Sequence, residues 1–127
     1  MAKTTIMVVD DEVDFNYMMS YWLKAKGYNV ISKSNGMDAL EVIKKNNLDM
    51  VFLDIAMPLM DGVEVLKQIR KLDKDLPVIM ITAYGTQDRV DMCQKSGISG
   101  FFAKEDNFDS LLEIIDTVLK LHKGLKK

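Results

Sequence analysis

Acidic side chains crowd together directly after an apolar run near the start of the chain. Asp10, Asp11, Glu12 and Asp14 follow the run at residues 7–9. Two unit charges about 4 Å apart cost about 4 kcal/mol at an effective dielectric of ~20. One interpretation is a solvated turn whose Asp caps the next helix. The other is a site that uses the carboxylates, and the rest of the chain decides between the two.

Three further apolar runs also end in polar residues that can do chemistry. The run at residues 49–53 leads into Asp54, another run ends in Thr82, and a third leads into Lys104. In open parallel sheets the ligand lies outside the carboxyl ends of the strands. Clustered carboxylates suit a hard divalent cation, and Mg²⁺ takes carboxylates, waters and a phosphate oxygen. The pattern therefore predicts a site for Mg²⁺ (or Mn²⁺).

The elements that must position these residues alternate along the chain. Short apolar runs predict five strands, at residues 4–9, 28–32, 49–53, 78–82 and 100–102. Apolar residues at helical spacing predict five helices, at residues 15–23, 37–45, 63–72, 86–96 and 108–119. Apolar strands that alternate with helices imply a parallel sheet covered on both faces. We therefore predict an α/β, flavodoxin-like, doubly wound sheet of strand order 2-1-3-4-5 with five helices.

The composition excludes several other classes of protein. A chain of 127 residues suggests one domain, residues 1–127. The net charge of −2 gives no support for direct binding of nucleic acid or of an anionic membrane. One cysteine and one histidine exclude a thiolate metal cluster, a multi-histidine zinc site and a Ser-His-Asp triad. Without an apolar stretch of membrane-spanning length or a signal-peptide profile, we expect a soluble cytoplasmic protein.

Four stretches together resemble the receiver domain of bacterial two-component response regulators. They are VVDDE, LDIAMPLMDG, ITAY and FFAKE, and the resemblance covers essentially the whole chain. It implies a signalling module and not an enzyme. The partner that donates the phosphoryl group would be a sensor histidine kinase or a histidine phosphotransfer protein. A downstream protein or output domain would bind the surface formed by the fourth helix, fifth strand and fifth helix.

The resemblance also implies a role for each polar residue of the site. Asp54 would be the phosphoacceptor, and Lys104 would contact the phosphoryl oxygens. Asp11 and Asp54, with the backbone carbonyl of Ala56, would ligate Mg²⁺, and Asp10 would act through the water shell of the metal. The chemistry is phosphoryl transfer by positioning and charge neutralisation, with a carboxylate as in-line nucleophile.

A second group of residues would report and time the signal. Thr82 would move its hydroxyl onto the phosphoryl group, and Phe101 would be the aromatic switch that follows it. Ala56 and Tyr84 would flank the approach of water and set the lifetime of the phosphorylated form. Glu105 stands where the family commonly has proline after the lysine, so we expect the following loop to take a trans path.

Three other functions compete with this interpretation. A small Mg²⁺-dependent phosphohydrolase that forms an aspartyl phosphate, of the haloacid-dehalogenase type, needs a D-x-D spacing, but Asp10 is followed two residues later by Glu12. A flavodoxin needs a phosphate loop rich in Ser, Thr and Gly after the first strand. A phosphorylation-independent pseudo-receiver would not need the full set of acidic, hydroxyl and lysine residues. The sequence does not name the kinase, the output partner or the oligomeric state.

Overall fold

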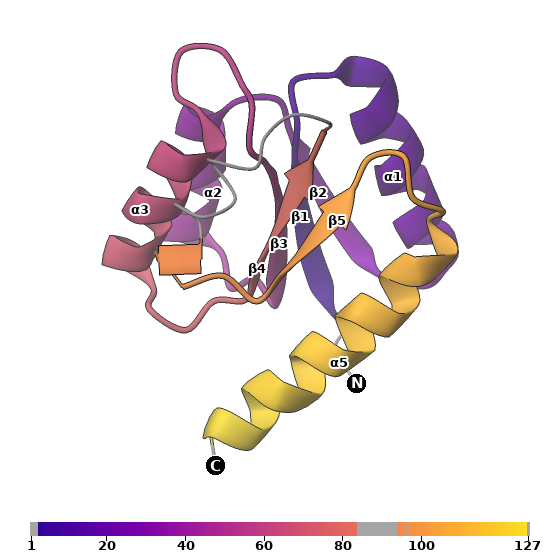
Figure 1. The fold of residues 1–127 in the computed structure, drawn as a ribbon. Coiled ribbons are helices and arrows are strands. Elements are labelled where there is room, and N and C mark those ends of the chain that lie inside the picture. Colours follow the sequence, from indigo (N-terminus) through magenta and orange to yellow (C-terminus); the bar gives the residue numbers. More distant parts are fainter. Residues whose placement is uncertain (1–2, 84–93, 96, 127) are drawn as a thin grey trace.

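The computed structural model describes residues 3–83, 94–95 and 97–126, which form a parallel sheet with helices on both faces (Figure 1). The five strands are β1 (Thr5–Val9), β2 (Asn29–Lys33), β3 (Met50–Asp54), β4 (Val78–Thr82) and β5 (Gly100–Ala103). They lie in the order β2-β1-β3-β4-β5, and all pairs are parallel. The predicted fold class and strand order are confirmed.

Four of the five predicted helices fall within the described residues. They are α1 (Val13–Ala25), α2 (Gly36–Lys45), α3 (Gly62–Leu72) and α5 (Asp109–Lys126). The helix predicted at residues 86–96 lies largely outside the described residues. No helix in the described part of the chain is both long and apolar enough to cross a membrane.

Side chains alternate across the sheet and build two separate cores. Met7 and Val9 of β1 pack with α2 and α3, while Ile6 and Val8 point to the opposite face and pack with α1 and α5. Figure 1 shows the same two layers of helices on either side of the strands. Because all four side chains are fully buried, β1 is fixed on both faces. The turn that follows β1 therefore starts from a rigid element.

The register of the strands brings the predicted site residues to one edge. Val9 pairs with Leu53, so the residues after them, Asp10 and Asp54, lie at the same level of neighbouring strands. Thr82, the last residue of β4, pairs with Ala103. The next residue along the chain, Lys104, donates its backbone N–H to the carbonyl of Thr82 at 2.9 Å. The carboxyl ends of four strands thus meet as the sequence predicts.

Gly62 allows the start of α3 to lie against the end of β3. Its N–H donates to the carbonyl of Ile55 at 2.7 Å, and the Asp61 side chain caps the helix by accepting from the N–H of Glu64 at 3.1 Å. A Cβ atom at Gly62 would lie only 2.1 Å from the backbone carbonyl oxygen of Asp54. The glycine that ends the LDIAMPLMDG stretch is therefore required, because the backbone at Gly62 lies very close to the backbone at the end of β3.

We predict that Gly62→Ala lowers the free energy of unfolding by more than about 2 kcal/mol, because the methyl group must displace backbone atoms rather than a flexible side chain. Gly100→Ala is the matched control, since a Cβ there would meet Ile79 Cδ1 at an ordinary 3.5 Å. Urea denaturation of both variants measures the difference. Equal stability of the two variants would contradict the close approach.

Candidate functional site

Three carboxylates lie together at the carboxyl edge of the sheet. Asp10, Asp11 and Asp54 each offer an oxygen, and these oxygens lie within 4.8 Å of one another. Asp10 is fully buried, Asp54 is 2% exposed and Asp11 is half-buried. Burying charged carboxylates next to each other is unfavourable unless cations compensate them. The arrangement is therefore one that attracts positive charge.

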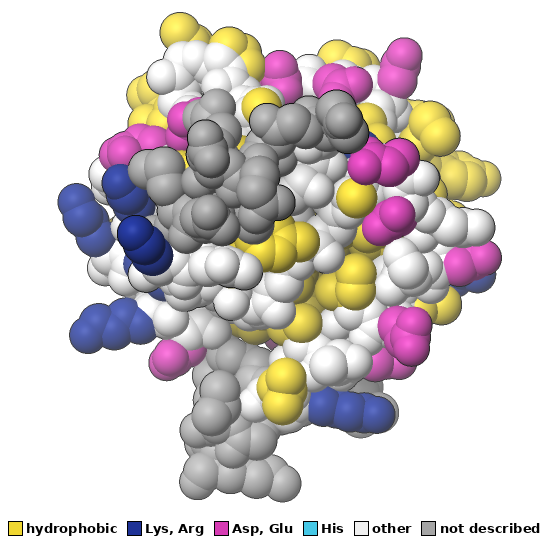
Figure 2. Space-filling model, viewed as in Figure 1, with side chains coloured by type: hydrophobic (Ala, Val, Ile, Leu, Met, Phe, Trp, Pro, Cys, Tyr) yellow, Lys and Arg dark blue, Asp and Glu magenta, His cyan; other side chains and the backbone are white. Residues whose placement is uncertain are grey.

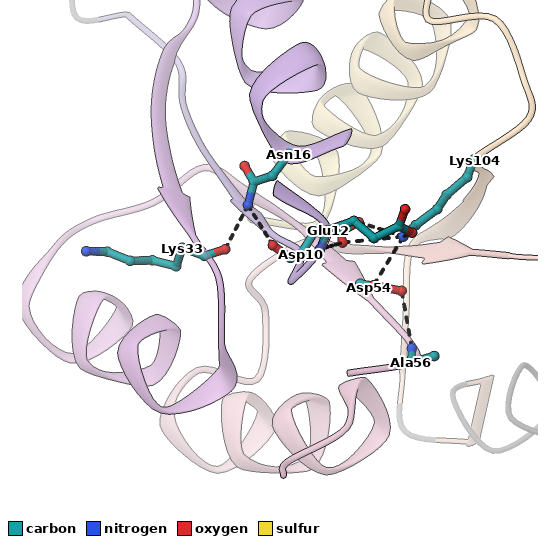
Figure 3. Close-up of polar contacts among 7 residues, drawn as sticks. All are labelled: Asp10, Glu12, Asn16, Lys33, Asp54, Ala56 and Lys104. Atoms are coloured by element: carbon teal, nitrogen blue, oxygen red, sulfur yellow. Dashed lines mark hydrogen bonds and ion pairs between the residues drawn. The ribbon is translucent and has the colours of Figure 1, made fainter. Parts of the chain in front are cut away.

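Lys104 supplies one of these compensating charges (Figure 3). Its Nζ lies 3.1 Å from Oδ2 of Asp10 and 3.3 Å from Oδ2 of Asp54, and it also contacts the carboxylate of Glu12. The same ammonium lies 5.0 Å from the centre of the Phe15 ring. Burial alone would lower the pKa of Lys104, but the hydrogen bonds to Glu12 and Asp10 and the charges of Asp10 and Asp54 raise it. Lys104 is therefore a permanent cation.

A single ammonium does not neutralise the two buried carboxylates. The pKa of Asp54 is raised to about 7, chiefly by burial and then by the neighbouring charge of Asp10, which raises this pKa more than the charge of Lys104 lowers it. One charge-assisted bond partly offsets this, because the N–H of Ala56 donates to Oδ1 of Asp54 at 3.2 Å. The site as it stands thus lacks positive charge around Asp54.

The residues present fit a divalent cation. Oδ2 of Asp10 is buried and has no hydrogen bond of acceptable geometry among the described residues, although Lys104 lies close to it. Carboxylate oxygens are hard ligands of the kind that Mg²⁺ prefers. Asp10, Asp11 and Asp54 could therefore hold a metal ion, which would offset their mutual repulsion.

A buried amide fixes the turn that carries Asp10. Nδ2 of Asn16 donates to the backbone carbonyls of Asp10 and of Lys33, both at 2.9 Å, and so joins the ends of β1 and β2 (Figure 3). Its Oδ1 accepts from the hydroxyl of Ser20 at 3.1 Å, and that hydroxyl lies 2.6 Å from the hydroxyl of Ser32. The N–H of Glu12 donates to Oδ1 of Asp10 at 2.8 Å. Asp10 is therefore held from both its backbone and its side chain.

The sequence pattern predicts no role for Asn16 or Glu12 at the site. Asn16 lies one turn before Met19 on the face of α1 that is buried. A polar residue at a core position of a helix indicates a buried hydrogen-bonding role, and this was the sign in the sequence that could have identified Asn16. Glu12 was counted only among the repelling carboxylates. Its contact with Lys104 joins residues 92 positions apart, and no local pattern in the sequence indicates it.

Nearly the whole chain is similar to proteins of one known family. The profile of the response regulator receiver domain family matches residues 6–116. The chain belongs to this family. A receiver domain is a signalling module rather than a classical enzyme, and it accepts a phosphoryl group at an acidic pocket. The acidic residues and Lys104 described above form that pocket.

Individual relatives agree with the family assignment. The chain is 31% identical over 121 residues to the sporulation initiation phosphotransferase F of Bacillus subtilis, covering 95% of this chain and 98% of that protein. It is 37% identical over 109 residues to the transcriptional regulatory protein ZraR of Klebsiella oxytoca, covering 86% of this chain. It spans only 25% of that longer protein, so the match there is to one part of it.

Solved structures of receiver domains have the same fold. A CheY-like receiver domain from Methanospirillum hungatei superposes with a TM-score of 0.92 at 25% identity, covering 97% of this chain and 98% of that one. The chemotaxis protein CheY4 of Vibrio cholerae superposes with a TM-score of 0.86 at 28% identity, covering 92% and 99%. The predicted resemblance to response regulators is thereby confirmed.

The structure describes three of the four remaining residues to which the resemblance assigns a role. Thr82 is half-buried at the end of β4, and Ala56 is exposed in the loop after β3. Phe101 is half-buried on β5, opposite Met80 in the register. Tyr84 lies outside the described residues. The roles of these residues in switching and in the lifetime of the phosphorylated form remain predictions.

The peptide after Lys104 is not cis, since the described residues contain no cis peptide bond. The N–H of Asp106 donates to the carbonyl of Ala103 at 2.9 Å, so the chain turns tightly after β5. Glu105 therefore follows the lysine on a trans path, as the sequence predicts.

We predict that Asn16→Ala lowers the free energy of unfolding by about 1–3 kcal/mol, because the carbonyl of Asp10 then loses a buried hydrogen-bond donor. The affinity for Mg²⁺ should also fall, since the Asp10 turn is no longer tied to β2. Asn47→Ala, at an exposed position of the loop after α2, is the control. Urea denaturation and calorimetric Mg²⁺ titration test both effects, and wild-type values for Asn16→Ala would contradict the role of the amide.

Proposed function

We propose that this receiver domain takes its phosphoryl group on Asp54, with Mg²⁺ (or Mn²⁺) held by Asp11, Asp54 and the carbonyl of Ala56. The supporting observation is the buried Asp54 carboxylate, which contacts Lys104 at 3.3 Å within a cluster of three acidic residues. Asp10 would act through the water shell of the cation. The bound cation would supply positive charge to the oxygens of the phosphoryl group.

The chain's own residues then carry the transfer. One carboxylate oxygen of Asp54 attacks the phosphorus in line, and the bond from phosphorus to the donor breaks opposite it. The leaving atom, a histidine nitrogen or an acetate oxygen, keeps the electron pair of the broken bond. The ammonium of Lys104 turns from carboxylate oxygens to phosphoryl oxygens and stabilises their charge. The hydroxyl of Thr82 binds another phosphoryl oxygen once Asp54 is modified.

The donor we propose is a phosphohistidine on a sensor histidine kinase or on a histidine phosphotransfer protein in the cytoplasm. The Bacillus relative, similar over nearly its whole length, is named as a phosphotransferase of sporulation, which supports a place in a phosphorelay. The output would be read on the face that contains β5 and α5, where Phe101 is half-buried. The partner on that face is a downstream protein or an output domain.

We predict that acetyl phosphate with Mg²⁺ adds one phosphoryl group to the wild-type protein, and that Asp54→Asn abolishes the addition because the amide is not a nucleophile. Asp14→Asn removes the same charge at an exposed position of α1 and should be phosphorylated like the wild type. Intact-mass measurement with and without Mg²⁺ gives the result. Phosphorylation of Asp54→Asn to the wild-type extent would reject Asp54 as the acceptor.

A further prediction concerns Asp11 as a direct ligand. Asp11→Ala should weaken Mg²⁺ binding at least about tenfold, the lower end of the loss seen when support of a metal site is removed. Without metal, the variant should be as stable as the wild type or more stable, because like-charge repulsion is relieved. Asp14→Ala serves as control for the loss of charge. Wild-type Mg²⁺ affinity of Asp11→Ala in a calorimetric titration would exclude a direct role.

A further inference from the structure

Glu12 is the one exposed carboxylate among the three that contact Lys104. Its side chain is 62% exposed, whereas those of Asp10 and Asp54 are 0% and 3% exposed. The Lys104 side chain itself is only 13% exposed. The ammonium is therefore held between two buried carboxylates and one exposed carboxylate (Figure 3).

The Glu12 carboxylate has a favourable environment at the start of α1 even without its contact to Lys104. Glu12 is the N-cap residue of α1, yet its side chain makes no capping hydrogen bond and contacts Lys104 instead. A negative charge near a helix N-terminus is stabilised by the helix dipole. Releasing Lys104 therefore costs Glu12 little, because the carboxylate remains exposed to water and beside the start of the helix.

A phosphoryl group on Asp54 would compete with Glu12 for the same ammonium. Lys104 can turn toward the phosphoryl oxygens without leaving Asp10, whose position is fixed by the N–H of Glu12 and by burial. Glu12 is the partner that can move aside. Until it does, Glu12 holds the cation that an anionic phosphodonor needs next to Asp54.

We propose that Glu12 is a positioning residue that holds Lys104 in the unphosphorylated protein and so limits the rate at which anionic donors phosphorylate Asp54. This inference rests on the proposed function, since it assumes that Asp54 is the acceptor. It predicts that neutralising Glu12 speeds phosphorylation. A role in merely orienting Lys104 would predict slower phosphorylation instead.

The first test compares Glu12→Gln with Asp14→Asn, which removes the same charge from the same helix turn at an exposed side chain. Phosphorylation of the purified protein by acetyl phosphate in Mg²⁺ is followed by intact mass over a range of donor concentrations. Glu12→Gln should raise the second-order rate constant about two- to fivefold relative to Asp14→Asn, the size expected for an ion pair with one exposed partner. The gain should shrink as salt is added.

The second test asks whether the effect passes through Lys104. In a Lys104→Met background, Glu12→Gln should no longer change the rate constant, because the ammonium for which the two groups compete is gone. An equal acceleration in that background would overturn the proposal, since general charge repulsion would then explain it. A Glu12→Gln rate equal to or below that of Asp14→Asn would overturn it as well.

The third test needs neither metal nor phosphoryl transfer. In a ¹⁵N-edited NMR spectrum of the side-chain ammonium groups, assigned with Lys104→Met, the Lys104 resonance should shift in Glu12→Gln and stay in place in Asp14→Asn. An unchanged Lys104 resonance would overturn the contact. Failure of the wild type to take up a phosphoryl group would count against the proposed function, and this third test would still decide whether Glu12 holds Lys104.

Discussion

Two buried carboxylates that share one ammonium are the constraint on which the rest of the structure depends. Asp10 and Asp54 are held out of water at the end of neighbouring strands, and Lys104 reaches both of them. Burial, and after it repulsion from the charge of Asp10, raises the pKa of Asp54 to about 7. Such a pocket is more stable with additional positive charge than without it, which is the property that a cation-dependent phosphoryl acceptor requires.

The fold tolerates this unfavourable arrangement because rigid elements surround it. Four strands end at this edge of the sheet, and the register sets the positions of the groups at their ends: Asp10 and Asp11 after β1, Asp54 in β3, Thr82 in β4 and Lys104 after β5. Asn16 ties the Asp10 turn to β2, and Gly62 lets α3 lie against the end of β3. The favourable packing of the two cores thus offsets the repulsion between the carboxylates at the end of the sheet. The functional site is therefore the part of the structure where the local electrostatic interactions are least favourable.

The sequence predicts the sheet and the carboxyl edge well, because buried strands leave an apolar run that ends abruptly in a polar residue. The strand ends are less predictable. Tyr28 was expected to open β2, but its N–H closes α1 by donating to the carbonyl of Leu23 at 3.2 Å, next to Gly27 with φ of 100°. The strand therefore starts at Asn29. Likewise, α5 continues to Lys126, beyond the predicted end at residue 119.

The identity of the charged residues was predictable, but their pairing was not. Asp10, Asp11, Asp54 and Lys104 stand at strand ends, so the topology alone brings them together. Glu12 contacts Lys104, which lies 92 positions further along the chain. This contact depends on how the two side chains are oriented in the folded protein, and the periodicity of the sequence does not encode that orientation. The same holds for the amide of Asn16, whose two acceptors come from different strands. Local patterns fix where a residue lies, while its partner is decided by tertiary geometry.

The backbone links at the site suggest how a local change reaches the surface. Lys104 is joined through its N–H to the carbonyl of Thr82, so the ends of β4 and β5 cannot shift independently. Phe102 is fully buried against α1 and α5, whereas Phe101, on the opposite face of β5, is only half-buried. A buried ring in a close-packed core resists movement more than a half-buried ring does. We therefore expect a rearrangement of Thr82 and Lys104 around a phosphoryl group to be transmitted to the Phe101 face of β5 rather than to the face on which Phe102 is packed.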